Sequence, residues 1–374
     1  MLIGIEASRA NRLQKTGVEW YSYRIIQGLK KMPEAGVHSW LLYGNAPLSM
    51  GLERMPSNWH ERRLDWPPKY LWTQARLSWE MMRRPPEVLF VPAHVLPRII
   101  PKRSVVTIHD IGFHRFPQLY KKIQVAYHEA TTQDIIKRAA KIITVSEFSK
   151  QEIVEGYGAD PSRITVTHLG VDHEKYRPAA PEAVAAVQSR LQIMSPYFMF
   201  VGRLEAKKNI LTVLEAFKQF KEARGEGDPT RLVLCGPTGA GFEQIENAYH
   251  ASGLGEAIKL TGYLPEADKI ALLTGASALV HPAWYEGFGL TPLEAMACDC
   301  PVISSDAASL PEVIGPGNAL YFSPDDPATL AALMAQILDA PDQAADLRAR
   351  GRMHVQSYTW ERTARATLKI LTEW

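Results

Sequence analysis

Short apolar runs alternate with longer amphipathic stretches along the whole chain. Residues 1–6, 197–201 and 278–281 are apolar runs of the length typical of buried parallel strands. Residues 20–29 form an amphipathic run, and the Thr-Gly-Val-Glu of residues 16–19 before them matches a helix capping box. Strands that alternate with helices in this way predict an α/β protein built on doubly wound parallel sheets.

The length and composition of the chain indicate two globular domains. A chain of 374 residues suggests about two domains, each large enough for its own core. Residues 178–181 and the alanine-rich segment after them have the composition of a connection. We therefore expect domains of residues 1–177 and 178–357. The fractions of hydrophobic residues (46%) and charged residues (22%) are those of an ordinary soluble protein.

The lack of a recognisable targeting signal and the cysteine content predict a cytoplasmic protein. The first residues lack the basic start and apolar stretch of a signal peptide. No apolar run is long enough to span a bilayer. Three cysteines, an odd number, give no disulfide framework and fit a reducing compartment. Cys298 and Cys300 lack a second ligand pair, so we expect no zinc site there.

The net charge of +2 hides an uneven distribution. Residues 1–190 contain 27 Lys and Arg against 18 Asp and Glu, whereas the remainder contains 15 against 22. This basic half predicts either contact with anionic lipid or a phosphate-bearing acceptor, or only an uneven solvated surface. Within it, residues 59–103 interleave tryptophan with basic residues, which suits a membrane interface or a lipid-linked acceptor. The seven-residue spacing of Trp72 and Trp79 instead favours packing in a core.

Residues 278–305 combine a strand, a glycine loop, a helix and a second strand. Thr291 is expected to cap the helix, with Pro292 at its first position. Free amides at a helix N-terminus beside the carboxyl end of a strand bind anions. Glu286 and Glu294 flank the loop, and carboxylates suit sugar or ribose hydroxyls, which leaves phosphates to the amides.

This stretch resembles the signature of glycosyltransferase family 4. Glu286 and Glu294 are separated by seven residues, with Gly-Phe-Gly between them and Pro-Leu-Glu-Ala-Met-Ala at the end. The family consists of retaining, nucleotide-sugar-dependent enzymes with the GT-B fold. The resemblance implies two Rossmann-like, doubly wound domains that face a cleft, and a C-terminal helix (358–374) that crosses back to the first domain. The first domain then binds the acceptor and the second the donor.

The resemblance also implies roles for individual residues. Arg203 and Lys208, five apart around a strand-to-helix turn, are expected to stabilise the departing diphosphate, with Lys207 as the alternative register. Glu286 is expected to contact hydroxyls of the transferred sugar, and His109, at a strand end, to hydrogen-bond a sugar hydroxyl near the reaction centre. The expected donor-binding residues are Gly17, Gly202, Gly236, Tyr263, Leu264, Gly287, Phe288, Gly289, Leu290, Thr291 and Glu294.

Several of these residues have simpler interpretations. Glu294 follows Thr291 by three residues and could close a capping box, while also binding ribose. Residue Thr16 could be no more than a helix cap. His109 and His114 could be metal ligands, but no further cluster lies near them in sequence, so we expect no metal there.

We therefore expect a metal-independent, retaining glycosyltransferase without cofactor. No Asp-x-Asp pair occurs in the sequence, and Arg203 and Lys208 can replace a cation against the diphosphate. Its partners are a nucleotide-sugar donor (GDP-mannose or a UDP-sugar) and a saccharide or lipid-linked acceptor at the inner face of the membrane, with no nucleic acid. The alternatives are an inactive nucleotide-sugar-binding module, or an epimerase or phosphorylase of the same fold.

Overall fold

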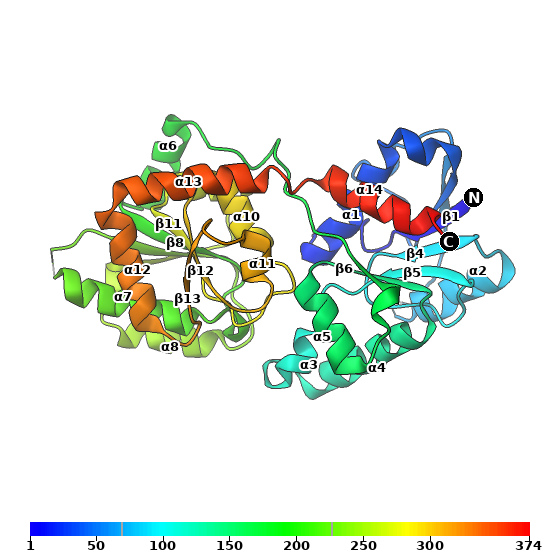
Figure 1. Ribbon diagram of the computed structural model, residues 1–374, viewed down its shortest axis with the longest axis horizontal. Helices are drawn as coiled ribbons and strands as arrows, with labels where there is room; N and C mark the ends of the chain where they lie inside the picture. Colours follow the sequence, from blue (N-terminus) through cyan, green and yellow to red (C-terminus); the bar gives the residue numbers. More distant parts are fainter. Residues whose placement is uncertain (69, 226) are drawn as a thin grey trace. The chain divides into compact units, whose positions relative to one another are not determined.

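The computed structural model of the chain describes residues 1–68, 70–225 and 227–374, so Lys69 of the tryptophan-rich segment lies outside the described residues. The chain forms two compact units (Figure 1). Unit 1 consists of Met1–Gly170 and Thr359–Trp374, and unit 2 of Val171–Tyr358. The composition of the chain predicts a first boundary after residue 177, whereas residues 171–177 pack with unit 2.

Unit 1 is built on a seven-stranded sheet in the order β3-β2-β1-β4-β5-β6-β7, with every pairing parallel. Its strands are β1 (Leu2–Glu6), β2 (Ser39–Gly44), β3 (Trp59–Arg63), β4 (Val88–Val91), β5 (Arg103–Thr107), β6 (Lys141–Thr144) and β7 (Ile164–Val166). The order reverses between β1 and β4, which makes the loops after these strands the switch point of a doubly wound sheet.

Helices cover both faces of the unit 1 sheet. On one face lie α1 (Gly17–Lys30) and α14 (Trp360–Thr372), and on the other α2 (Ser78–Arg83), α4 (Lys122–Arg138) and α5 (Glu147–Tyr157) (Figure 1). Successive strand residues point to opposite faces. Val88 and Phe90 of β4 therefore pack with α1 and α14, and Leu89 and Val91 pack with the other layer. The shorter helical segments are η1 (Pro33–Val37), η2 (Trp72–Leu77), α3 (Gly112–Arg115), η3 (Pro117–Leu119) and η4 (Pro161–Arg163).

Unit 2 repeats this architecture with six parallel strands in the order β10-β9-β8-β11-β12-β13. They are β8 (Tyr197–Val201), β9 (Arg231–Cys235), β10 (Ile258–Gly262), β11 (Ala278–His281), β12 (Val302–Ser305) and β13 (Leu320–Phe322). Phe198 and Phe200 of β8 pack in the core with α7 (Ile210–Arg224) and α12 (Pro327–Asp339). Tyr197 points to the opposite face, where its hydroxyl donates to the Leu272 carbonyl at 2.7 Å.

The remaining helical segments of unit 2 complete its two helical layers. They are α6 (Pro181–Leu191), η5 (Ala206–Lys208), α8 (Phe242–Ala251), η6 (Gly255–Ala257), α9 (Glu266–Gly275), α10 (Leu290–Ala297), α11 (Leu310–Ile314) and α13 (Pro341–Val355). None of the helices in the described part of the chain is long and apolar enough to cross a membrane.

The predicted α/β class and doubly wound sheets are confirmed, and two local expectations fail. Residues 178–181 and the alanine-rich segment after them were expected to be a connection, yet α6 occupies Pro181–Leu191. The Trp72–Trp79 pair was expected on one core face, but Trp72 is buried whereas Trp79 is 44% exposed. The reason is that η2 is a π-helix, whose wider turns rotate Trp79 off the face that Trp72 occupies.

Candidate active site

Four neighbouring strands of unit 2 place most of the predicted donor-site residues along one edge of the sheet. The strands β10, β9, β8 and β11 lie side by side in that order. The residues that follow them are, in the same order, Tyr263 and Leu264, Gly236, Gly202 and Arg203, and residues 282–289. The strand order reverses between β8 and β11, and open α/β sheets bind ligands at such a switch point.

Two glycines let the loops after β8 and β9 approach each other. Gly236 has a φ of 144°, which favours glycine, and an added Cβ would lie 1.9 Å from the carbonyl oxygen of Gly202. The Gly202 amide donates to the Cys235 carbonyl at 2.9 Å, and the Gly236 amide to the Gly262 carbonyl at 2.9 Å. The edge is therefore lined here by main chain, which suits a ligand bound through backbone groups.

Lys208 and Glu286, which are 78 residues apart in sequence, form an ion pair at this edge. Lys207 instead pairs with Glu205, with 3.2 Å between Nζ and Oε1. The lysine paired with the glycine loop is therefore Lys208. The next residue, Asn209, is buried with a φ of 56°, and its Nδ2 donates to the Pro282 carbonyl at 3.0 Å.

The environment of Glu286 favours its ionised form. Burial opposes ionisation of Glu286. The charge of Lys208 and, to a smaller extent, the hydrogen bond with His281 outweigh burial and hold the pKa of Glu286 well below its usual range. His281 ends β11, is 2% exposed, and has Nε2 3.2 Å from Oε1 of Glu286. His281 was not among the predicted site residues, although its place at a strand end is the same signal that singled out His109.

Two serine hydroxyls donate hydrogen bonds to main-chain carbonyls of the loop of residues 282–289. Ser305 Oγ donates to the Ala283 carbonyl at 2.6 Å, and Ser309 Oγ donates to the Glu286 carbonyl at 2.8 Å. Phe288 is buried and packs edge-on against Tyr358, with ring centroids 6.0 Å apart. The loop that carries Glu286 and Gly287 is thus held by contacts on both of its sides.

The expected cap of the following helix is wrong. Thr291 and Pro292 lie inside α10, which begins at Leu290 with Gly289 as its N-cap residue. Gly289 has a φ of 94°, and a glycine in this conformation turns the loop directly into the helix. Pro292 is tolerated because the first four amides of a helix have no partner within the helix. The amides near the start of α10 therefore point toward the loop, as an anion site requires.

Glu294 closes no capping box, because its carboxylate turns toward α9. Its Oε2 lies 3.3 Å from Nζ of Lys269. Burial raises the pKa of Glu294, and the charge of Lys269 opposes that rise. The remaining predicted residues differ in exposure: Leu264 is buried, Tyr263 is 77% exposed, and Arg203 is exposed and packs its methylenes over Gly239.

Two predicted residues lie in unit 1. Gly17 is the first residue of α1 and follows Thr16, whose amide donates to Oε2 of Glu19 at 3.1 Å, so this half of the predicted capping box is present. An added Cβ at Gly17 would meet no atom within 4 Å. Close packing within unit 1 therefore does not require glycine at this position.

His109 lies just after β5 and is almost entirely buried. Its Nε2 lies 3.1 Å from the Pro92 carbonyl, an acceptor, so this nitrogen carries the proton and Nδ1 is left as an acceptor. Its ring stands edge-on to Tyr21, with 4.6 Å between centroids. Burial lowers the pKa of His109 to about 4, with a smaller contribution from His94. The imidazole is therefore neutral at physiological pH and suited to hydrogen bonding.

His114 does not join His109 in a shared site. Its Nδ1 pairs with Oε1 of Glu129 at 2.7 Å. Within the described ranges, no three His, Cys, Asp or Glu side chains are grouped as metal ligands.

The low pKa of His109 predicts a pH dependence of stability. Between pH 6.5 and 4 the unfolded chain protonates this ring and the folded chain does not, so the free energy of unfolding falls as the pH falls. His109→Gln keeps a donor near the Pro92 carbonyl and is expected to remove about 2 kcal/mol of the stability that the wild-type protein loses between pH 7 and 5. Urea unfolding of both proteins at pH 7 and 5 measures it. If the free energy of unfolding falls equally in both proteins between pH 7 and 5, His109 protonates freely in the folded state.

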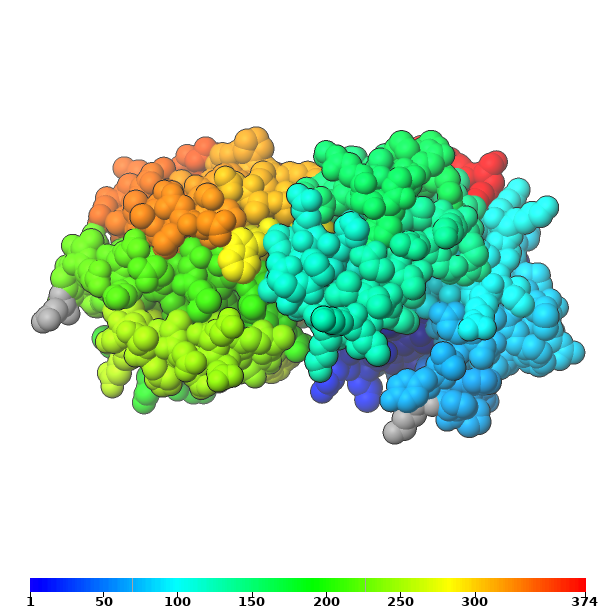
Figure 2. All heavy atoms as spheres, turned by 90° about the horizontal axis from the view of Figure 1, so that it is seen from below, coloured from blue at the N-terminus to red at the C-terminus, as the bar shows by residue number. Residues whose placement is uncertain are grey.

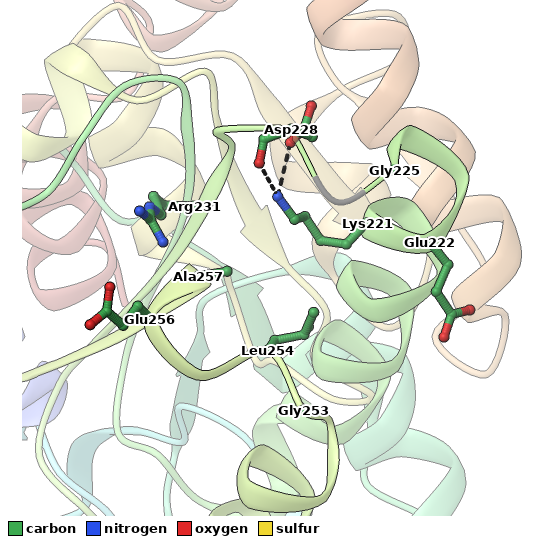
Figure 3. A pocket seen from close by; sticks show the side chains of 9 residues that line it. All are labelled: Lys221, Glu222, Gly225, Asp228, Arg231, Gly253, Leu254, Glu256 and Ala257. Atoms are coloured by element: carbon green, nitrogen blue, oxygen red, sulfur yellow. Dashed lines mark hydrogen bonds and ion pairs between the residues drawn. The ribbon is translucent and has the colours of Figure 1, made fainter.

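A pocket elsewhere in unit 2 contains none of the predicted site residues. It has a volume of about 520 Å³ and lies at the opposite, amino-terminal edge of the sheet, where Arg231 begins β9 (Figure 3). Its Lys221 is already paired with Asp228 at 3.2 Å. Its place and its paired charge give it no part in the site described above.

Known proteins resemble this chain in both sequence and fold. Residues 15–175 match the family described as Glycosyltransferase Family 4, and residues 186–354 the family described as Glycosyl transferases group 1. The O-antigen chain mannosyltransferase B of Escherichia coli is 30% identical over 294 residues, which cover 78% of this chain and 76% of that protein. A D-inositol 3-phosphate glycosyltransferase of Streptomyces scabiei is 28% identical, and the matched part spans 64% of this chain and 55% of that relative.

Solved structures share the architecture at low identity. Sucrose-phosphate synthase from Thermosynechococcus elongatus superposes with a TM-score of 0.76 at 18% identity, covering 99% of this chain and 98% of that one. WaaG, a glycosyltransferase involved in lipopolysaccharide biosynthesis, does so with a TM-score of 0.73 at 14% identity over 100% of both chains. The chain therefore belongs to glycosyltransferase family 4 and is a sugar-transferring enzyme of glycan biosynthesis with the GT-B fold.

Proposed function

We propose that this enzyme is a retaining, metal-independent glycosyltransferase that moves mannose from a nucleotide-sugar donor to a saccharide or lipid-linked acceptor. One observation carries the proposal: Lys208 and Glu286 pair at the switch point of the unit 2 sheet, beside the strand end that bears Arg203. The leaving group of such a transfer is a nucleoside diphosphate, and preorganised cations stabilise the charge that develops on it.

The diphosphate is proposed to bind between cationic side chains and helix amides. Among the described residues Arg203 makes no ion pair, and its exposed guanidinium can offer two parallel donors to a phosphate. Lys208 adds a point charge, and the first amides of α10 add donors at a positive helix end. The sequence has no Asp-x-Asp pair that could hold a cation against the diphosphate.

In the proposed step the acceptor hydroxyl attacks the anomeric carbon from the face that the diphosphate leaves. The bond from that carbon to the phosphate oxygen breaks, and the hydroxyl proton passes to the departing phosphate. Glu286 is unsuited to act as a nucleophile, because Lys208 and His281 both face its Oε1. We assign it to hydrogen bonds from sugar hydroxyls, and His109 to a similar contact through its free Nδ1.

Relatives favour the choice of donor and acceptor. The relative from Escherichia coli is named a mannosyltransferase of O-antigen chains, which favours a mannosyl donor and a saccharide acceptor. The Anabaena protein HepE, solved in complex with UDP-glucose, shares the fold with a TM-score of 0.75 at 15% identity. A nucleotide sugar as donor is therefore consistent with both likenesses.

A surface of unit 1 supports the lipid-linked alternative for the acceptor. Trp79 is exposed and lies between the guanidinium groups of Arg76 and Arg83, 4.9 and 4.7 Å from its ring centroid. On α4, part of the teal surface in Figure 2, Ile123 is 77% exposed and Tyr127 52%. Exposed aromatic and basic side chains suit the interface of an anionic membrane, so the proposal includes contact with its inner face.

Thermal stability with GDP, UDP and ADP, each in the presence of EDTA, tests the donor site. A nucleotide at 100 times its Kd adds about 2.7 kcal/mol, which raises the melting temperature by a few degrees. We expect a shift with one nucleotide, and the anomeric configuration of the product made from its sugar then tests retention. A shift that requires a divalent cation would contradict metal independence, and no shift with any nucleotide would contradict the donor site.

A further inference from the structure

Lys269 of α9 stands at the centre of a buried polar cluster beside Glu294. Its Nζ lies 2.6 Å from Oε1 of Glu266, 3.3 Å from Oε2 of Glu294 and 2.8 Å from the hydroxyl of Tyr176. An ammonium group has three donors, and here each has an acceptor. The side chains of Lys269 and Glu294 are both only 14% exposed, and Tyr176 is 6% exposed. The position of the charge is therefore fixed.

Glu294 needs such a charge to remain ionised. A carboxyl group that is removed from water favours its neutral form, and the burial of Glu294 raises its pKa accordingly. For Lys269 burial acts in the opposite direction, but Glu294 and Glu266 outweigh it and raise the pKa of the lysine. Lys269 therefore stays protonated and holds its charge against Oε2 of Glu294. A hydrogen bond from the Tyr176 hydroxyl also favours the charged form of Glu294.

The other groups around Glu294 leave Lys269 as its principal counter-charge. Burial opposes ionisation of Glu266, but Lys269 and Lys175 outweigh it and lower the pKa of Glu266 to about 2, so this carboxylate is negative. Lys175 contributes its charge to Glu266, with which it forms an ion pair. At the end of α10, burial raises the pKa of the Cys298 thiol, which is therefore neutral.

We infer that Lys269 is a positioning residue for the donor: it keeps the Glu294 carboxylate ionised and oriented to accept hydrogen bonds from the ribose hydroxyls, while the Tyr176 hydroxyl holds the lysine in place. The inference rests on the proposed donor site. Hydrogen bonds to an ionised acceptor are about twice as strong as those between neutral groups. A nucleotide thus gains less affinity from its ribose when Lys269 is absent.

The competing explanation is a cluster that merely ties residues 171–177 to α9, and a ribose-specific measurement separates the two. The probes are the nucleoside diphosphate that stabilises the enzyme and its 2′,3′-dideoxy analogue, with Kd measured by calorimetry. We expect the wild-type enzyme to bind the ribose form about tenfold or more tightly than the analogue. Lys269→Met is expected to lose most of this ratio, as Glu294→Gln does, with little change for the analogue.

The pH dependence gives a second readout. Lowering the pH protonates Glu294, and without Lys269 this happens at a higher pH. We expect the ribose-form affinity of Lys269→Met to begin to fall at a higher pH than that of the wild-type enzyme as the solution is acidified. Lys218→Met, at an exposed lysine of α7, is the matched control and is expected to change neither readout.

Tyr176→Phe keeps the inference testable if Lys269→Met does not fold. It removes one of the three acceptors of Lys269 together with the hydrogen bonds that the hydroxyl makes to Glu266 and Glu294. We expect it to reduce the ribose ratio about two- to threefold. A full wild-type ratio in the folded lysine variant, or in Tyr176→Phe if that lysine variant cannot be folded, overturns the inference but leaves the donor site standing. A wild-type enzyme that binds both probes equally overturns the role of Glu294 and the inference together, and one that binds neither overturns the proposed function as well.

Discussion

Replacing Lys208 by methionine is expected to lower kcat about 10²–10³-fold, in the range measured when a single preorganised donor to a developing oxyanion is removed. The methionine keeps most of the length and apolar bulk of the lysine stem but removes the charge. Charge on the diphosphate grows as the bond to the sugar breaks, so the loss is greater in the transition state than in the bound donor. We therefore expect KM for the donor to change much less than kcat.

Lys207→Met is the matched control, because the neighbouring lysine pairs with Glu205 rather than with the glycine loop. We expect its kcat to stay within about twofold of the wild-type value, since a half-exposed surface pair contributes little. Initial rates over a range of donor concentrations measure both variants. Equal losses in the two variants would show that general positive charge, and not the position of Lys208, supports the reaction.

The same substitution affects stability through Glu286. Lys208 and Glu286 are each about one fifth exposed, and removing one partner of such a pair costs roughly 2–4 kcal/mol. Glu286 has a depressed pKa when folded, so its contribution is present above the unfolded pKa of about 4.5 and is lost as the pH falls. The stability difference between the wild-type enzyme and the variant should therefore be constant above about pH 5 and shrink as the pH falls below about 4.5.

Local sequence patterns were enough to predict the strands and loops that carry the proposed donor-site residues. The strand predicted at residues 278–281 is β11, and the glycines and the Arg and Lys after neighbouring strands all lie at one edge of the sheet. This follows because the carboxyl ends of parallel strands share an edge, whatever the details of the packing. The place of Lys208 could thus be inferred without knowing the tertiary contacts.

The partners of these residues could not be inferred in the same way. Lys269 is 93 residues from Tyr176 and 25 from Glu294, and only the packing of α9 against α10 and residues 171–177 brings them together. The strand β3 was not predicted, for another reason. It lies at an edge of its sheet, and its sequence, Trp-His-Glu-Arg-Arg, lacks an apolar run. An edge strand needs little apolar surface, so its pattern is weak.

Replacing Gly170 by alanine is expected to destabilise unit 1 by roughly 3–5 kcal/mol, the upper range for a single substitution. Gly170 is the last residue of the first segment of unit 1, where α14 begins to pack. An added Cβ would lie 2.1 Å from the amide nitrogen of Trp360 and 2.3 Å from the carbonyl carbon of Thr359. Backbone atoms cannot rotate away as a side chain can, so the start of α14 must move.

That movement also breaks contacts that hold α14. The Thr363 hydroxyl donates to the His168 carbonyl at 2.7 Å, and Ala364 faces α1 so closely that a Cβ at Gly28 would lie 2.6 Å from its own. Leu368 and Leu371 further along the helix are buried in the same core. A shift at Gly170 is therefore transmitted to a helix with no room to adjust.

Tryptophan fluorescence during urea unfolding measures this effect selectively, because eight of the nine tryptophans lie in unit 1. Gly36→Ala is the control, since an added Cβ at Gly36 meets no atom within 4 Å, and we expect a change within about 0.5 kcal/mol. If both variants unfold at the wild-type urea concentration, the backbone near residues 359–360 moves to accept the added Cβ without lowering the free energy of unfolding, which contradicts the prediction.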